Sequence, residues 1–347
     1  MRPARPGRPP WRALLAWSTI LVLWTIALLP AVARAEAPGA VPPDSPGDAV
    51  PYGGEPGSLT PRSLATVTLR AVPPEALDPS LDRSAAVGTV FYSRHPGREA
   101  PWLVFVHGIH EGPSYFQPMY GQAFQAGYNV AAVKLDPGAD AVADGAILAE
   151  QLNRLSRMAQ DRLVAIGHSM GGLDVAEATA RYGSPAVAAL VTLGTPWGGS
   201  PLADVDRALA GNPLTRIVPD LLGYGTPSDR WLTPATVQAE VAGLHPRLGY
   251  PIVSMVGEIR RPSLTMGIQV LAGLALLALL GYPRSDGVVP VEMQTYPYAS
   301  PASVFVMPGV GHLDYRNFWN SPGTAGVPSV ESILRGVLQV EPVASPR

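Results

Sequence analysis

The chain has 347 residues, a formal net charge of -2 and no cysteine. The lack of cysteine excludes disulfide bonds and a thiol nucleophile, so the fold must depend on its apolar core. With 47% hydrophobic and 15% charged residues, the chain can bury a core of the size that one α/β domain requires. The weakly negative charge, with no basic stretch outside the N-terminal region, argues against a nucleic-acid partner.

Residues 1–35 have the three parts of a secretory signal. Four arginines within the first twelve residues precede an apolar run over 13–29, and small residues surround Ala35. This order predicts a signal peptide and export to the periplasm or the medium. The apolar run approaches the length that spans a bilayer, so an uncleaved membrane anchor is the alternative. Residues 36–61, rich in proline and glycine, are predicted to be a flexible linker.

Residues 62–347 alternate between short apolar runs and segments with helical periodicity, which is typical of a single α/β domain. Strands are predicted at 66–71, 87–93, 101–106, 163–166, 188–193, 250–257 and 303–307, and helices at 144–159, 172–182 and 330–338. Helix 144–159 has Leu148, Leu152 and Leu155 on one face, so it is expected to cover a side of the sheet.

A strand, a tight turn and a helix meet at Gly167-His168-Ser169-Met170-Gly171. This is the context of a nucleophile elbow, in which a strained turn presents a serine hydroxyl at the tip of a sheet. The two glycines leave the room that such a turn needs. We therefore predict Ser169 as a nucleophile and the N–H of Met170 as a donor to an oxyanion. An incidental serine in a glycine-rich turn is the alternative.

The second oxyanion donor is expected in the loop after the strand at 101–106. That strand runs into His107 and Gly108, and the next residue, Ile109, is our candidate donor. We interpret His107 as a structural histidine that braces this loop. His110 is either a pocket wall or a surface residue.

The strand at 188–193 leads into Gly194-Thr195-Pro196-Trp197-Gly198-Gly199-Ser200. With the His-Gly pair and the Gly-His-Ser-Met-Gly-Gly run, in this order and spacing, the chain resembles the α/β-hydrolase superfamily. Within it, the chain is most similar to bacterial triacylglycerol lipases and esterases. The resemblance covers residues 87–340 and implies a mostly parallel central sheet with helices on both faces, a cap insertion, and a triad in the chain order serine, acid, histidine.

Two carboxylates stand where this order places the acid. Asp286 lies in a Ser-Asp-Gly-Val-Val-Pro run that resembles the acid loop of these lipases, and we predict it as the acid. Glu258, directly after the strand at 250–257, is the alternative, because residues 260–284 separate that strand from Asp286.

His312 is the only histidine downstream of both carboxylates, on a glycine-containing loop after the strand at 303–307. Imidazole changes charge near neutral pH, so His312 can take the proton of Ser169 and return it to the leaving alcohol while Asp286 orients its ring. His95 and His245 are interpreted as loop residues. His168 is expected to face away from Ser169, because neighbours on a strand point to opposite sides.

We expect no cofactor. The resemblance implies calcium as an alternative, because in some bacterial lipases an aspartate two residues after the catalytic histidine, the position of Asp314 here, helps to bind a structural calcium. Calcium takes several oxygen ligands, and no acidic cluster surrounds Asp314, so a solvated loop residue is the preferred interpretation and calcium the alternative. A zinc site is not expected, since the chain has neither cysteine nor a His-Glu-x-x-His helix.

Two insertions are expected to set the choice of substrate. The cap insertion, about 200–249, mixes many apolar residues with few charges and is either a mobile cover over an acyl pocket or an ordinary packed cap. The second insertion, about 260–284, holds residues 266–280, where Gln269 is the only polar side chain. That run is short for a membrane span and favours a buried or interfacial helix, which would contact lipid if it lies exposed near the active site.

Together these patterns predict an exported serine hydrolase that cleaves carboxylic esters, of lipids in particular, through an acyl-enzyme. The expected partner is a small-molecule or lipid ester, with a membrane or lipid surface as a further contact. A phospholipase, polyester depolymerase, acyltransferase or amidase would use the same residues. The alternative of another class is a hydrolase-like binding or assembly module without catalysis.

Overall fold

The computed structural model describes residues 67–342 apart from 98, 211–225, 264–267 and 321–327. These residues all belong to the second of two units into which the chain divides, residues 61–347. The predicted signal peptide and linker lie outside the described residues, as does the middle of the cap insertion.

The domain is built on a sheet of eight strands in the order β1-β2-β4-β3-β5-β6-β7-β8. Neighbouring strands are parallel except for the antiparallel pair β2 and β4. The strands are β1 (Thr68–Ala71), β2 (Thr89–Ser93), β3 (Trp102–Val106), β4 (Asn129–Val133), β5 (Leu163–His168), β6 (Val187–Leu193), β7 (Ile252–Glu258) and β8 (Val304–Pro308). The predicted mostly parallel sheet and its seven predicted strands are confirmed.

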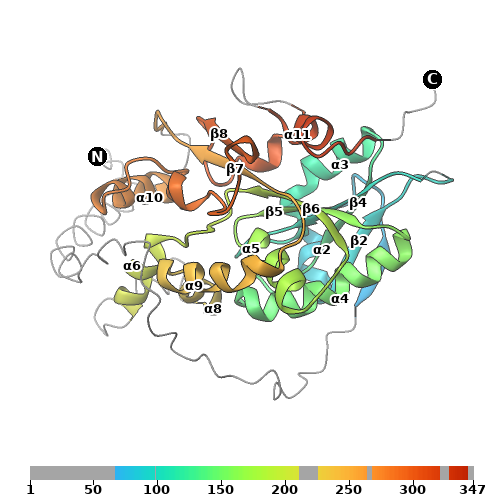
Figure 1. The fold of residues 1–347 in the computed structure, drawn as a ribbon, viewed down its shortest axis with the longest axis horizontal. Coiled ribbons are helices and arrows are strands. Elements are labelled where there is room, and N and C mark those ends of the chain that lie inside the picture. The colour runs from blue at the N-terminus through green and yellow to red at the C-terminus, as the bar shows by residue number, and fades with distance from the viewer. Residues whose placement is uncertain (1–66, 98, 211–225, 264–267, 321–327, 343–347) are drawn as a thin grey trace, which may run out of the picture. The chain divides into compact units, whose positions relative to one another are not determined.

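Helices cover both faces of this sheet (Figure 1). One face carries α3 (Gln117–Gln125) and α11 (Val330–Gly336), and the other carries α4 (Ala141–Ala159), α5 (Gly171–Ala176) and α9 (Pro234–Leu244). The remaining helices are α2 (Pro79–Ser84), α6 (Pro201–Ala210), α8 (Pro227–Trp231) and α10 (Ile268–Leu279). None of the helices in the described ranges is both long and apolar enough to cross a membrane.

The core lies in two layers because side chains on a strand alternate between its faces. On β3, Leu103 and Phe105 belong to the layer under α3 and α11, whereas Val104 and Val106 belong to the layer under α4. Helix α4 begins where the side chain of Asp140 accepts a hydrogen bond from the N–H of Ala143 (2.9 Å). It buries the predicted face of Leu148, Leu152 and Leu155.

Three features differ from the predictions. Strand β4 and helix α3 were not predicted from the sequence. The helix after the elbow, predicted over 172–182, is α-helical only to Ala176 and continues as a wider π-helical turn over Glu177–Arg181. This widening occurs where α4 passes closely, since a Cβ at Gly145 would lie 2.6 Å from Cβ of Glu177.

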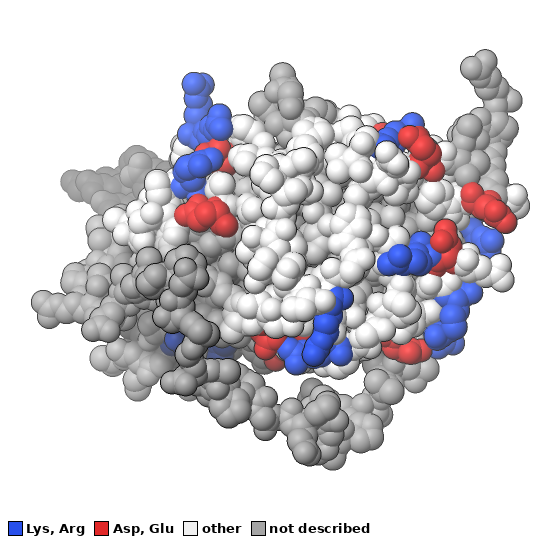
Figure 2. All heavy atoms as spheres, in the orientation of Figure 1, with Lys and Arg blue, Asp and Glu red and all other residues white. Residues whose placement is uncertain are grey.

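Charged side chains on the face shown in Figure 2 occur mainly beside charges of opposite sign around its margin, and the centre of this face is uncharged. Exposed ion pairs such as Arg157 with Glu150 and Arg335 with Glu331 follow this pattern. Such exposed pairs add little to stability, so the apolar core and the buried groups dominate the energetics.

Burial raises the pKa of three carboxyls, Asp144, Asp174 and Glu177, and so makes the stability depend on pH. Asp144 lies inside α4, accepts a hydrogen bond from the N–H of Asp136 (3.1 Å) and is almost fully buried. Burial raises the pKa of Asp144 to about 7. The folded state therefore holds the proton of Asp144 more tightly than the unfolded chain does. As a result, the contribution of Asp144 to the free energy of unfolding is largest below about pH 4 and falls as the pH rises towards 7.

Asp144→Asn should remove the contribution of Asp144 to this dependence while keeping an oxygen for the N–H of Asp136. We expect the variant to become more stable relative to the wild type by about 1.4 kcal/mol for each pH unit between 4 and 7. Urea denaturation at pH 4, 5.5, 7 and 8 measures this difference. Glu150→Gln, at an exposed position of the same helix, is the control for the loss of one carboxylate from α4. Parallel pH profiles for wild type and Asp144→Asn would contradict the prediction.

Candidate active site

Ser169 lies in the turn between β5 and α5, in a left-handed backbone conformation with φ 52°. Gly167 and Gly171 are required because other backbone atoms lie too close to them to leave room for a side chain. A Cβ at Gly167 would lie 2.6 Å from the nitrogen of Gly172, and one at Gly171 would overlap the carbonyl oxygen of Val106. Because any side chain there would collide with backbone, these glycines allow the strained turn that the elbow prediction requires.

His312 reaches Ser169 from the loop after β8. Its Nε2 lies 3.0 Å from Oγ of Ser169, although the two residues are 143 positions apart in the sequence. The main-chain N–H of His312 donates to the carbonyl oxygen of Asp286 (2.9 Å), which ties the two loops together. Ser169 and His312 are each only 5% exposed, so their contact is shielded from water.

Asp286 contacts the other nitrogen of the same ring. Its Oδ2 lies 2.7 Å from Nδ1 of His312, and its Oδ1 accepts the N–H groups of Val288 (3.0 Å) and Val289 (2.8 Å). A carboxylate can only accept, so Nδ1 carries the hydrogen and Nε2 is left to accept the hydroxyl proton of Ser169. The structure thus brings together the three residues predicted from chain order, in the geometry of a serine, histidine, acid triad.

The electrostatic surroundings favour the protonated form of His312. Burial by itself would lower its pKa, but the negative charge of Asp286 and the hydrogen bond to it outweigh burial, and Glu111 adds to them. The net effect raises the pKa of His312. A base that holds its proton firmly is suited to take one from a serine hydroxyl.

The two predicted oxyanion donors lie beside these three residues. Met170 precedes the first residue of α5, and the N–H groups of Met170 and Ile109 have no hydrogen-bond acceptor within the described part of the chain. Gly108 brings the Ile109 loop against Ser169, because a Cβ at Gly108 would lie 2.7 Å from Cβ of Ser169. Two free N–H groups beside a nucleophile are what an oxyanion hole needs.

Glu258, the alternative acid, has a different set of partners. Its carboxylate accepts Nε of Arg284 (2.7 Å) and Nε of Arg260 (2.9 Å), and the hydrogen bond from Arg284, with that from Arg260, lowers its pKa. Arg260 and Arg284 stand at the two ends of the apolar insertion. The structure therefore places Asp286 at the histidine and makes Glu258 a clamp that closes the base of that insertion.

The remaining histidines have structural contacts. His107 braces the loop that carries Ile109, as predicted, since it contacts the carbonyl of Gly108 (2.9 Å) and accepts the N–H of Leu135 (3.2 Å). His110 pairs with Asp229 (3.1 Å) and so joins this loop to α8 of the cap. His168 does not contact the Ser169 hydroxyl, and its Nε2 instead meets the main-chain carbonyl of His312 (2.8 Å).

Asp314, the candidate calcium ligand, accepts the main-chain N–H of Gly311 (2.9 Å) in a tight turn beside His312. Within the described ranges, no three acidic or histidine side chains gather in a way that could hold a metal ion. The interaction at Asp314 thus shapes the loop that carries His312.

Three further side chains, those of Glu111, Gln294 and Tyr315, support the site and were not singled out from the sequence. Glu111 accepts Nδ1 of His168 (2.9 Å) and the N–H of Gly108 (3.0 Å). Gln294 accepts the N–H of Gly257 (2.7 Å) and the hydroxyl of Tyr315 (2.9 Å), and it donates to the carbonyl of Val289 (2.9 Å) behind the acid loop. Only Glu111 had a local signal, as a carboxylate close to the His-Gly pair.

Helix α10 packs directly on the acid loop. A Cβ at Gly273 would overlap the carbonyl oxygen of Gly287, and a Cβ at Gly287 would lie 2.7 Å from Cγ1 of Val270. Leu277 is fully buried, whereas Leu279 is 62% exposed. The apolar insertion is therefore part buried and part exposed, next to the catalytic acid candidate.

No protein-family model matches the sequence, and no curated protein is similar to it. Among solved structures, the chain is similar to the mature form of the Bacillus licheniformis lipase BlEst2, with 25% sequence identity and a TM-score of 0.58 over 67% of this chain and 94% of that one. The propeptide form of the same lipase gives 22% identity and a TM-score of 0.61 over 76% of this chain and 56% of that one.

The chain has the α/β-hydrolase fold, as the sequence motifs predicted, and the sheet order and these similarities are consistent with a relationship to the α/β-hydrolase superfamily. The protein in both of these solved structures is a lipase, which supports an ester hydrolase here.

Proposed function

We propose that this chain is an exported serine hydrolase that cleaves carboxylic esters of lipids through an acyl-enzyme. The observation that carries the proposal is the continuous hydrogen-bonded path from Oγ of Ser169 through the ring of His312 to the carboxylate of Asp286. Export rests on the signal-like sequence of residues 1–35.

The geometry supports two acyl transfers in succession. Oγ of Ser169 attacks the ester carbonyl carbon while its proton passes to Nε2 of His312, and Asp286 stabilises the imidazolium that forms. The N–H groups of Met170 and Ile109 donate to the carbonyl oxygen as it becomes negative. Collapse of this intermediate expels the alcohol, which takes the proton from Nε2. Water then attacks the acyl-serine by the same steps and releases the acid.

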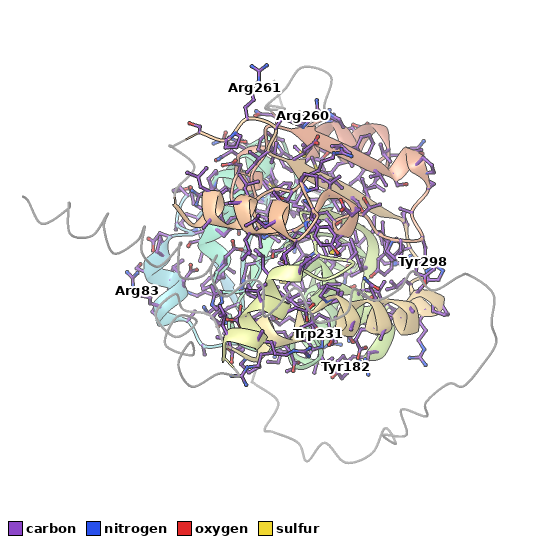
Figure 3. All side chains as sticks on the ribbon, turned by 90° about the vertical axis from the view of Figure 1, so that its left-hand side faces the viewer. Arg83, Tyr182, Trp231, Arg260, Arg261 and Tyr298 are labelled. Carbon is purple, nitrogen blue, oxygen red and sulfur yellow. The ribbon has the colours of Figure 1, made fainter. Side chains whose placement is uncertain are left out.

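A lipid ester is the favoured substrate because of the surface around the site. Figure 3 shows α10 (orange) crossing this side of the domain, with Arg260 and Arg261 above it and Trp231 of the cap below. From Val270 to Leu279 the helix has no polar side chain, and Leu313, next to the base, is 51% exposed. An apolar surface beside a triad is suited to rest on a lipid layer and draw an acyl chain from it.

Hydrolysis of a p-nitrophenyl ester series of increasing acyl length by the mature domain tests the proposed function. We expect turnover that rises with acyl length, and covalent labelling of Ser169 by a fluorophosphonate probe. A folded protein that neither hydrolyses any ester nor reacts with the probe would be a binding or assembly module instead. Turnover of short esters alone would make it an esterase of soluble substrates.

The proposed lipid contact predicts different outcomes for two leucines of α10. Leu279→Ser, at an exposed position, should lower activity on an emulsified triglyceride by about tenfold and leave hydrolysis of p-nitrophenyl acetate and the melting temperature nearly unchanged. Leu277→Ser should destabilise the fold by about 3 kcal/mol and lower both activities together, because it leaves a cavity and a buried hydroxyl. Tributyrin emulsion assays and thermal melts distinguish these results.

Val337→Ser is the matched control, since Val337 is an exposed apolar residue at the end of α11. It should change neither activity. Equal loss on both substrates for Leu279→Ser, with a normal melt, would contradict a lipid contact through α10.

A further inference from the structure

Glu111 and His168 form a buried pair beside the triad that the steps above do not use. The side chain of His168 has no exposed surface, and that of Glu111 is largely buried. The ring of His168 stacks on Tyr115 with centroids 4.3 Å apart, and it lies 4.9 Å from the ring of His312. Burying a charged or strongly polar pair costs free energy unless its atoms are hydrogen-bonded, so the partners of Glu111 and His168 are informative.

Both nitrogens of His168 face oxygen atoms that can accept hydrogen bonds. Nε2 lies 2.8 Å from the carbonyl oxygen of His312, and Nδ1 lies 2.9 Å from Oε2 of Glu111. Burial would raise the pKa of Glu111, but the charge of His168 and the hydrogen bonds from His168 and Gly108 outweigh burial and lower it. With Glu111 ionised, His168 donates from both nitrogens and carries a positive charge.

The pair connects two parts of the site that are far apart in the sequence. Oε2 of Glu111 accepts the N–H of Gly108, the residue before the oxyanion candidate Ile109. Nε2 of His168 holds the main-chain carbonyl of the base, 144 residues further along the chain. One continuous path therefore runs from the oxyanion loop through Glu111 and His168 to His312.

We propose that Glu111 and His168 are positioning residues that together fix the oxyanion loop and the base loop around Ser169. The inference rests on the proposed function. Neither side chain contacts the reacting atoms, and the pair acts through the N–H of Gly108 and the carbonyl of His312. Small displacements of a catalytic group lower the rate strongly, so the effect of losing the pair should appear mainly in kcat.

Two substitutions of His168 separate its two contacts. Asparagine places its amide nitrogen near the position of Nδ1, so His168→Asn keeps a donor for Glu111 and loses the donor to His312. Glutamine places its nitrogen near Nε2, so His168→Gln keeps the donor to His312. We expect His168→Asn to lower kcat for a p-nitrophenyl ester by about 10- to 100-fold with KM within about threefold, and His168→Gln to retain more of kcat.

The pH profile provides a readout that a merely structural role would not change. His312 faces Asp286 directly, with Glu111 and His168 behind it, while burial raises the pKa of the nearby hydroxyls of Tyr115 and Tyr315 so that they stay neutral. His168→Gln removes the positive member of the pair and leaves Glu111 negative, so the acid limb of kcat should move to higher pH. In Glu111→Gln/His168→Gln both charges are gone, and the limb should return close to that of the wild type.

The control is His95→Gln, because His95 also contacts a main-chain carbonyl (Phe124, 3.0 Å) and stacks on an aromatic ring (4.0 Å). His95 adjoins Asn129 at the opposite end of the parallel strands, so kcat and the pH profile should not change. If His168→Asn does not fold, the double variant, which buries no unpaired charge, decides the question through its pH limb compared with that of His168→Gln.

Wild-type kcat in folded His168→Asn, or identical acid limbs in wild type, His168→Gln and the double variant, would overturn the positioning role while leaving the proposed function intact. Failure of the proposed function is a different result, in which the wild-type protein itself hydrolyses no ester and does not react with a fluorophosphonate.

Discussion

Replacing Ser169 by alanine should lower ester hydrolysis by about four to six orders of magnitude without unfolding the protein. Within the part of the chain that the structure describes, the side-chain hydrogen bond of Ser169 Oγ is to Nε2 of His312, so removing Oγ leaves no charged group without a partner. His312→Ala should have a similar effect on the rate, because the serine then has no base. Steady-state hydrolysis of a p-nitrophenyl ester, with a thermal melt of each variant, measures both effects.

The double variant gives the sharper result. Residues that act as one unit are not additive, so Ser169→Ala/His312→Ala should be about as inactive as either single variant. Additive losses would mean that the two side chains act independently, and substantial turnover by purified Ser169→Ala would remove Ser169 from its proposed role.

The second large effect concerns the acid. Asp286→Asn should lower kcat by about four orders of magnitude, because an amide in place of the carboxylate no longer fixes Nδ1–H of His312 or stabilises its imidazolium form. The N–H groups of Val288 and Val289 still have an oxygen to bond, so the loop should keep its shape. Both expectations can be measured on one preparation by kinetics and by melting.

Glu258→Gln is the matched comparison, since it changes a carboxylate at the alternative acid position to an amide of the same size. It weakens the contacts to Arg260 and Arg284 and should lower stability modestly while changing kcat by less than about threefold. The opposite ranking of the two variants would move the acid to the end of β7 and make Asp286 a structural loop residue.

The substitutions that test the lipid contact of α10 and the Glu111 and His168 pair are expected to have smaller effects than those in the proposed triad. The exposed side of α10 bears on which substrates reach the site. The Glu111 and His168 pair bears on how firmly the site is held once a substrate is bound.

The features that could be predicted from the sequence are those whose cause is local. The elbow is visible because a strained turn needs glycines on both sides of the serine, and those needs act within five residues. Most strands could be predicted for a similar reason, since burial on both faces requires an uninterrupted apolar run. Chain order then pointed to His312, as the only histidine downstream of both carboxylates.

Features that depend on neighbours distant in the sequence became visible only in the folded chain. The segment Asn129–Val133 contains two alanines, which are uncommon in strands, so its sequence predicts a strand only weakly. In the fold it lies between β2 and β3, where every one of its residues is buried and it forms β4. Only the folded chain shows that Asp286 rather than Glu258 meets His312, and that His168 holds a carbonyl 144 residues away. Contacts of this kind leave no periodicity or motif, because their geometry is set by the packing of whole elements.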